Sequence, residues 1–334
     1  MTEVDRTRYA LSAEDNDRIF HEEVVPLFLA PATAQRDPVA VFLGGQTGAG
    51  KSRTSDLLHA ALQERGTPVV VDLDQLKPFH PRYAELMRQD DSTAGAYTSI
   101  DGRAWMAKLM AHAAAARVDV LMESAMRGPS EFLEPVQLYH EAGYRVGVAI
   151  LAVPAAQSRL GVLDRYWTQV EQDGSGRVIN TEIHDGSYRG VLDCADAIDR
   201  GTTVDTVTVI RRGNIVVYQN TRAGDGGWAV APGARAAVEA ERHRPWTVEE
   251  REEFAATFTR LRQAMGPQWQ TELDRIQALR DSAAARAAQV FDPTSWILTT
   301  PVRRIGGPAG GTGEEQRPPR SPDQEQWRGR GVGR

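Results

Sequence analysis

The residues with the clearest chemical meaning form one segment, GGQTGAGKS over 44–52, which follows an apolar run over 39–43. The spacing GxxxxGKS is that of a phosphate-binding loop, in which glycines let backbone N–H groups point at a phosphate. Lys51 is expected to reach the β- and γ-phosphates, and Ser52 to give a hydroxyl to Mg²⁺. The segment therefore predicts a nucleoside triphosphate site. Its nucleotide-binding residues are Gly45, Gln46, Thr47, Gly48, Ala49, Gly50, Lys51 and Ser52.

Acidic residues follow two more predicted strands. Asp72 and Asp74 come at the end of the apolar run 68–71, and Glu123 ends the run 118–122. Ligands of parallel α/β sheets lie at the carboxyl ends of the strands, so we expect these side chains to face the γ-phosphate. Asp72 and Asp74, two residues apart, are expected on one face of the extended chain. Each carboxylate could support Mg²⁺, accept a proton from a hydroxyl or only cap the next helix, and spacing does not decide between these roles.

Strands and helices alternate along the first half of the chain. Apolar runs predict the strands, and the segments between them have the composition and spacing of helices. Strict alternation implies a parallel sheet with helices on both faces, so the predicted fold class is α/β of the P-loop NTPase type. The strands are expected at 39–43, 68–71, 118–122 and 144–153, with helices that include 104–116 and 131–142.

The chain divides into parts by composition and turn signals. A helix is expected to begin at the cap-like Ser12 and to be closed by Pro26. Residues 212–214 read as a hairpin turn, and later helices are expected at about 248–265 and 268–290. The last residues are rich in Gly, Pro and Arg with almost no apolar side chains, which predicts disorder. We divide the chain into an N-terminal helical segment 1–35, a P-loop kinase domain 36–222, a mostly helical C-terminal extension 223–302 and a disordered tail 303–334.

Composition limits the classes of partner. The chain has 334 residues, of which 41% are hydrophobic, and its net charge is −6. This mild acidity argues against a nucleic-acid partner, because neutralising phosphates requires a basic face. A single cysteine, Cys194, excludes an internal disulfide framework, and no apolar run of about 18 residues is present for a membrane span. We therefore expect a cytoplasmic protein that acts on a small molecule or binds another protein.

Taken together, the motifs resemble the zeta toxin family, including its pneumococcal PezT type, whose members phosphorylate UDP-N-acetylglucosamine with ATP or GTP. The resemblance runs from about residue 12 to residue 200, and the order and spacing of its elements track the family. It rests on LGGQxGxGKS at 43–52, VDxDxxxxxHP at 71–81, ExxxR at 123–127, LDRY at 163–166, Arg177 and HD at 184–185.

On the nucleotide side, the resemblance implies that Lys51 and Ser52 contact the phosphates and Mg²⁺. Arg165 and Arg177 match two arginines that clamp the triphosphate and bring positive charge to the transferred phosphoryl group. The structural alternative for Arg165 is an ordinary salt bridge on a helix. The expected cofactors are ATP or GTP and Mg²⁺.

On the acceptor side, Asp74 matches the general base that removes the proton from the sugar 3′-hydroxyl. The resemblance also implies that Asp74, Glu123 and Arg127 bind the sugar-nucleotide substrate. Two departures fall on this side. The segment 103–108 has no acid where the family tends to have a glutamate, and Ser124 follows Glu123 where the family has Thr or Gly. Nucleotide binding is therefore better supported than the identity of the acceptor.

The expected activity is the ATP- or GTP-dependent phosphorylation of the sugar 3′-hydroxyl of UDP-N-acetylglucosamine or a related sugar nucleotide. The expected biological output is growth arrest, with an antitoxin protein as partner. Two alternatives stay open. One is a P-loop kinase of another hydroxyl acceptor, such as an antibiotic or a polynucleotide end. The other is a nucleotide-binding regulatory protein without transfer activity.

Overall fold

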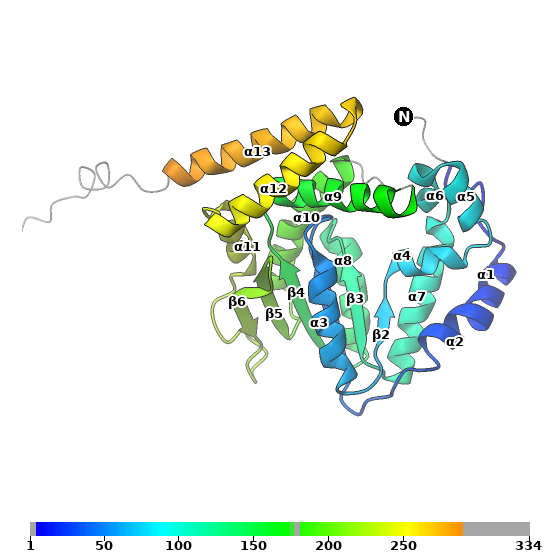
Figure 1. Cartoon of the computed structure of the whole chain (residues 1–334). Helices are drawn as coiled ribbons and strands as arrows, with labels where there is room; N and C mark the ends of the chain where they lie inside the picture. The colour runs from blue at the N-terminus through cyan, green and yellow to red at the C-terminus, as the bar shows by residue number, and fades with distance from the viewer. Residues whose placement is uncertain (1–4, 175, 177–180, 290–334) are drawn as a thin grey trace, which may run out of the picture. The chain divides into compact units, whose positions relative to one another are not determined.

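A computed structural model of the chain describes residues 5–174, 176 and 181–289 (Figure 1). In this part of the chain, six strands form one sheet in the order β2-β3-β1-β4-β5-β6. The first five run parallel, and β6 returns antiparallel to β5 through the predicted hairpin. The bounds are β1 Val39–Gly44, β2 Val69–Val71, β3 Val120–Ser124, β4 Arg145–Leu151, β5 Thr206–Arg211 and β6 Ile215–Thr221.

The central strand β1 is covered on both faces, as its continuous apolar run predicts. Phe42 packs against Phe132 and Tyr139 of α8 (Pro129–Glu141), with ring centroids 5.9 Å and 6.1 Å away. Leu43, which points to the opposite face, belongs to a separate apolar cluster with Leu58 of α3 (Lys51–Gln63). Figure 1 shows α3 in front of the sheet and α8 behind it. The predicted α/β class, with helices on both faces of a mainly parallel sheet, is therefore confirmed.

The remaining elements of the main sheet region connect these layers. Ser12 caps the first helix, as predicted, by accepting a hydrogen bond from the backbone of Asp15 at 3.1 Å. Pro26 does not end this helical segment: it lies in the first turn of α2, directly after the π-helical turn. The bounds are α1 Ala13–Ile19, a π-helical turn Phe20–Val24, α2 Val25–Phe28, α4 Leu73–Leu76, a 3₁₀ turn Lys77–Phe79, α5 Tyr83–Gln89, α6 Asp91–Tyr97, α7 Ser99–Ala116, α9 Ala155–Asp173 and α10 Thr181–Arg200.

The C-terminal extension contributes three helices and a second core. α12 (Val248–Ala264) and α13 (Gln270–Gln289), joined by a 3₁₀ turn at Pro267–Trp269, agree with the sequence, whereas α11 (Ala234–His243) was not expected. α12 and α13 pack on α9 through a cluster separate from the sheet core. Its buried members include Leu160, Leu163, Phe254, Leu261, Leu273 and Ile276. The predicted tail 303–334 lies outside the described residues.

Candidate functional site

The phosphate loop leaves β1 at the centre of the sheet and runs into α3. Gly48 has φ +75°, and a Cβ there would lie 1.9 Å from the carbonyl oxygen of Ser158 on α9. Gly50, with φ +87°, is the N-cap of α3, and no side chain caps that helix end. The loop therefore depends on glycine for its conformation, and the first N–H groups of α3 remain available to an anion.

Lys51 lies at the centre of this loop. Its Nζ donates hydrogen bonds to the carbonyl oxygens of Gly45 at 2.8 Å and Gln46 at 3.4 Å. Burial lowers the pKa of Lys51, while the charges of nearby carboxylates oppose that shift. These bonds hold the ammonium where the loop curls, which is the position that the sequence motif predicts for a phosphate contact.

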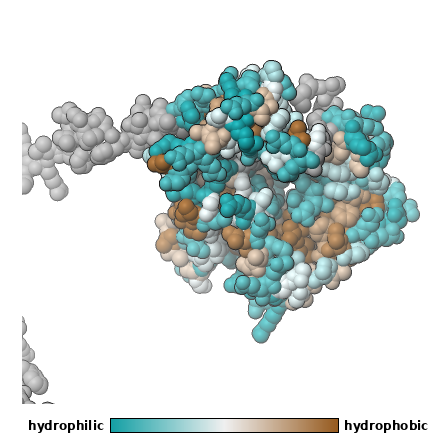
Figure 2. Space-filling model, viewed as in Figure 1, coloured by the Kyte–Doolittle hydropathy of each residue, from teal (hydrophilic) through white to brown (hydrophobic). Residues whose placement is uncertain are grey.

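Four other predicted residues come close enough to Lys51 to affect its pKa. The carboxylates of Glu123, Asp72 and Asp74 raise it, and the guanidinium of Arg165 lowers it. Glu123 reaches this place because β3 pairs with β1 so that Leu43 lies beside it. The structure thus brings Lys51, both aspartates, Glu123 and Arg165 together at the carboxyl edge of the sheet. In the space-filling view the surface is recessed below α9 at this edge (Figure 2).

The two aspartates do not share one face of an extended chain, which corrects the expectation from their spacing. Asp72 is the N-cap of α4, and its Oδ1 accepts a hydrogen bond from the backbone N–H of Asp74 at 2.9 Å. The helix begins at Leu73, so Asp74 lies in its first turn. Burial, followed by the like charges of Asp74 and Glu123, raises the pKa of Asp72. Asp72 therefore caps a helix and faces the site at the same time.

Asp74 has a partner that the sequence reading missed. Its Oδ1 accepts a hydrogen bond from the Nζ of Lys77 at 2.7 Å. The lysine side chain is 5% exposed and the aspartate side chain 48% exposed, so one partner is buried and the other reaches solvent. A lysine three residues after an aspartate, at a helix start, is a local signal that could have been read.

Arg127 is not among the charges that act on Lys51. Arg127 donates to Glu131 in the first turn of α8 at 2.8 Å, and its side chain is 42% exposed. Arg177 lies outside the described residues. Arg165 stands on α9 next to Asp164, which pairs with Arg260 of α12. Among the described residues Arg165 itself makes no ion pair, and its charge lowers the pKa of Lys51.

Two arginines that support the phosphate loop were also missed. Arg212, in the β5–β6 turn, donates to the carbonyl oxygen of Gly48 at 2.8 Å. Arg242, on α11, donates to Oε1 of Gln46 at 3.0 Å. Both contacts join residues more than 160 positions apart, so no local pattern could have revealed them.

The two histidines of the motifs have structural surroundings. His80 is buried, with Nε2 2.9 Å from the carbonyl oxygen of Tyr9 and Nδ1 accepting from the backbone N–H of Arg82. These partners require the proton on Nε2. His184 is buried between α9 and α10, with Nε2 2.8 Å from Oγ of Ser158. Both rings hold segments together beside the site.

The loop also has features that suit a bound nucleotide. The hydroxyl of Thr47 is buried and has no hydrogen-bond partner among the described residues. Ser52 is exposed at the start of α3, where its hydroxyl can contribute one ligand to Mg²⁺. Within the described ranges, no three His, Cys, Asp or Glu residues are grouped to hold a metal ion. None of the described helices is long and apolar enough to cross a bilayer.

A glycine loop between a central parallel strand and a helix, with its lysine inside and carboxylates at the adjoining strand ends, defines a kinase-like, nucleotide-binding P-loop protein. The model of one family, the zeta toxins, matches residues 29–223, which is more than half of the chain. The chain therefore belongs to the zeta toxin family, as the motifs predicted.

Known relatives agree with this assignment. Toxin PezT of Streptococcus pneumoniae serotype 4 (strain ATCC BAA-334 / TIGR4) is 25% identical over 188 residues, which are 56% of this chain and 74% of that protein. Toxin zeta of Enterococcus hirae is 21% identical over 188 residues, or 56% of this chain and 65% of that protein. A solved structure of the pneumococcal PezAT chromosomal toxin-antitoxin system matches with a TM-score of 0.63 and 20% identity. That match covers 76% of this chain and 97% of the other, and it shows a common fold.

Proposed function

We propose that this protein is a kinase that transfers the γ-phosphoryl group of ATP or GTP to a hydroxyl group of a sugar nucleotide. The observation that supports this most is that the charges of Glu123, Arg165, Asp72 and Asp74 all act on the ammonium of Lys51, which itself contacts the carbonyl oxygens of Gly45 and Gln46 in the loop. A phosphoryl-transfer site requires cations for the phosphates and a carboxylate for the attacking hydroxyl, close together. Both kinds of group are present at this edge of the sheet.

The nucleotide side would act through positioning and charge. The loop N–H groups and Lys51 hold the β- and γ-phosphates, and Ser52 provides a hydroxyl to Mg²⁺. The metal, when bound, withdraws negative charge from the phosphate oxygens. Arg165, and Arg177 by the family resemblance, add positive charge where the transferred group carries its own. Nucleotide binding would exchange the bonds of Lys51 to its own loop for bonds to phosphate.

The acceptor side would use Asp74 as general base. Its carboxylate is half exposed, so an incoming hydroxyl can approach it, and the bond from Lys77 fixes its orientation. As the hydroxyl oxygen attacks phosphorus, its proton would pass to Asp74. Asp72 is less suited to this step, because its Oδ1 already caps α4.

We propose the 3′-hydroxyl of UDP-N-acetylglucosamine as acceptor, with Glu123 and Arg127 contacting the substrate. The Arg127–Glu131 pair is exposed, so releasing Arg127 to a ligand would cost only about 0–1 kcal/mol. We also propose an antitoxin protein as partner, since the similar pneumococcal structure is of a toxin-antitoxin system.

One observation favours a different hydroxyl acceptor as second candidate. Where the family tends to have an acid on the helix before β3, this chain has Trp105 and Lys108 on α7. Both contact α1 instead: Trp105 Nε1 donates to the backbone of Asn16 at 2.9 Å, and Lys108 pairs with Asp17 at 2.5 Å. This stretch of α7 is committed to internal packing, so the acceptor would be held differently.

The test is direct. Purified protein is incubated with Mg²⁺, ATP or GTP, and UDP-N-acetylglucosamine, and a monophosphorylated product is sought by mass spectrometry. A panel of other sugar nucleotides, aminoglycosides and 5′-hydroxyl oligonucleotides separates the first proposal from the second. Lys51→Ala is the control and should abolish transfer. Nucleotide binding without transfer to any acceptor would favour a regulatory protein instead.

A further inference from the structure

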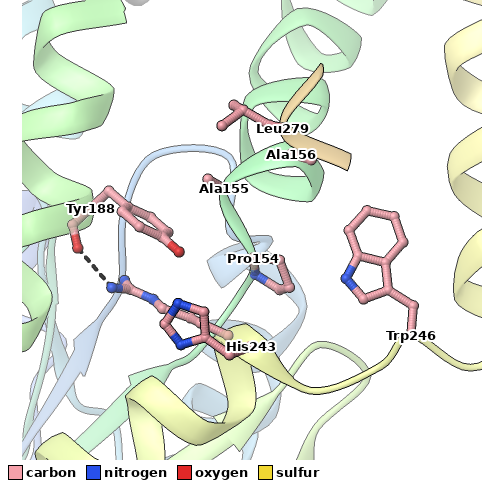
Figure 3. A pocket seen from close by; sticks show the side chains of 8 residues that line it. Pro154, Ala155, Ala156, Tyr188, His243, Trp246 and Leu279 are labelled. Carbon is pink, nitrogen blue, oxygen red and sulfur yellow. Dashed lines mark hydrogen bonds between the residues drawn. The ribbon is translucent and has the colours of Figure 1, made fainter. Parts of the chain in front are cut away.

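A buried arginine lies behind the phosphate loop. Arg242 is 3% exposed, and its Nη1 donates to the carbonyl oxygen of Tyr188 at 2.8 Å, a bond drawn as the dashed line beside Tyr188 in Figure 3. Its guanidinium lies 3.8 Å from the centroid of the Tyr188 ring. The Nη2 of Arg242 donates to Oε1 of Gln46, whose Nε2 in turn donates to the carbonyl oxygen of Val153 at 2.7 Å. Both the oxygen and the nitrogen of the Gln46 side-chain amide are therefore held by hydrogen bonds.

The positive charge of Arg242 makes no ion pair in the described part of the chain. The carboxylate whose charge acts on it, Glu239, is itself paired with Arg235 at 3.1 Å. The three contacts of Arg242 are a carbonyl, an amide and an aromatic ring, and no described carboxylate lies within ion-pair distance. The adjacent Glu241 is already paired with Arg211 at 2.7 Å and Arg244 at 2.5 Å. Burial lowers the pKa of Arg242 to about 10, so the group is still charged at neutral pH. Its Nε is buried without an acceptor. Burying a cation without an ion-pair partner costs folding free energy, so a counter-charge supplied by a ligand would explain why this arginine is buried.

We propose that Arg242 is a positioning residue for the phosphate loop, and that the polyphosphate of the bound nucleotide is its counter-charge. This rests on the proposed function, in which a nucleoside triphosphate occupies the loop. Arg242 acts through Gln46 and through its electric field, without touching the phosphates. A fixed cation in a site from which water is excluded acts more strongly on a polyanion than one in water.

The inference extends the site beyond the matched family segment. That segment ends at residue 223, whereas Arg242 belongs to α11. Ala234 and Val238 anchor α11 in the main core, so its arginine is carried on a rigid element. Nucleotide affinity should therefore depend on the C-terminal extension.

The test measures binding of ATP, ADP and inorganic tripolyphosphate by calorimetry, without any acceptor. Arg242→Met removes the charge and keeps the aliphatic length, and we expect ATP and tripolyphosphate affinity to fall by about 10- to 100-fold, with a smaller loss for ADP. Arg242→Lys keeps the charge and should recover part of the affinity. Absence of transfer by the wild type would refute the kinase proposal and leave this one standing.

The matched control is Arg222→Met. Arg222 also stacks on an aromatic ring, Trp228 at 3.8 Å, and donates to the carbonyl oxygen of Val204. It follows Thr221, which pairs with Thr206 at the opposite edge of the sheet from the loop. This change should lower thermal stability without changing affinity. A folded Arg242→Met protein that binds tripolyphosphate like the wild type would overturn the proposal.

If Arg242→Met does not fold, a double-mutant comparison tests whether Arg242 acts on the loop through Gln46. In a Gln46→Met background, Arg242→Lys should weaken tripolyphosphate binding less than it does in the wild type, because the hydrogen bond to Gln46 is already lost and the lysine keeps the charge in both backgrounds. Equal losses in both backgrounds would show that Arg242 does not act through Gln46.

Discussion

Asp72 and Asp74 are the same residue type, two positions apart, in different surroundings. Asp72 is partly buried, caps α4 and has a raised pKa. Asp74 reaches solvent and is held by Lys77. Sequence spacing left their roles open, because it could not show that the chain becomes helical at Leu73. The difference in surroundings supports Asp74 as the base and gives Asp72 a structural role that can be tested separately.

Replacing the proposed base should affect chemistry more than binding. For Asp74→Asn we expect ATP affinity within a few-fold of the wild type and phosphoryl transfer lower by about 10²–10⁴, the loss usual for a positioned general base. The change is nearly isosteric, and the phosphates are held by other groups. Steady-state transfer and calorimetric ATP binding measure the two effects. If Asp72→Asn were crippling and Asp74→Asn mild, the two assignments would be reversed.

Asp72→Asn should stabilise the protein at neutral pH. Folding raises the pKa of Asp72, so this carboxyl group loses its proton more readily in the unfolded chain than in the folded one. The free energy of unfolding therefore falls as pH rises from about 4 towards the raised pKa. That loss persists at pH 7. Asparagine keeps the N-cap and removes the charge. We expect Tm to rise by about 2–4 °C at pH 7, with the gain narrowing towards pH 4. A lower Tm at pH 7 would mean that the charge stabilises the site.

At the scale of elements, the phosphate loop is formed as much by α9 as by its own glycines. We expect Gly48→Ala to abolish nucleotide binding and to destabilise the fold, because its Cβ would meet the backbone of Ser158, which cannot move aside. Gly143→Ala is the control: its φ is also +75°, but nothing lies within 4 Å of the added carbon. It should cost only the local conformational strain, about 1–2 kcal/mol. Denaturant unfolding and ATP titration compare the two, and equal effects would show that α9 does not constrain the loop.

The elements that sequence predicts best are those that carry their own pattern. The buried strands appear as continuous apolar runs because both of their faces are covered, and the loop has a fixed spacing of glycines and lysine. α11 was missed because its apolar positions are mostly alanines and two of its buried positions, Glu241 and Arg242, are charged. The contact from Arg242 to Gln46 spans 196 positions and leaves no local trace. Sequence patterns therefore do not reveal the contacts between distant residues that hold a site in place.

At the scale of the whole described chain, α9 contacts both the phosphate loop and the helices of the C-terminal extension. Near the start of this helix, the backbone of Ser158 lies against Gly48, and Arg165 lies near its middle. Its apolar face packs on α12 and α13. Arg159, also on α9, is 6% exposed and pairs with Asp185 of α10 and Glu272 of α13. A buried arginine with two carboxylate partners fixes the helix against both neighbours, and removing those partners would leave its charge uncompensated.

Two truncations should therefore have opposite outcomes. Deleting the residues after about 303 should leave activity and Tm nearly unchanged, because that segment has almost no apolar side chains. Deleting from Val248 onwards removes α12 and α13 and exposes the apolar face of α9, so we expect a large loss of Tm and of transfer.

A single substitution in α12 should weaken the same packing. Leu261→Ala, at a fully buried position, should lower the free energy of unfolding by about 2–5 kcal/mol, whereas Leu57→Ala, 58% exposed on α3, should change it little. Thermal unfolding and ATP binding on all four proteins test this link. A stable protein that binds ATP after loss of α12 and α13 would show that α9 holds its place without them.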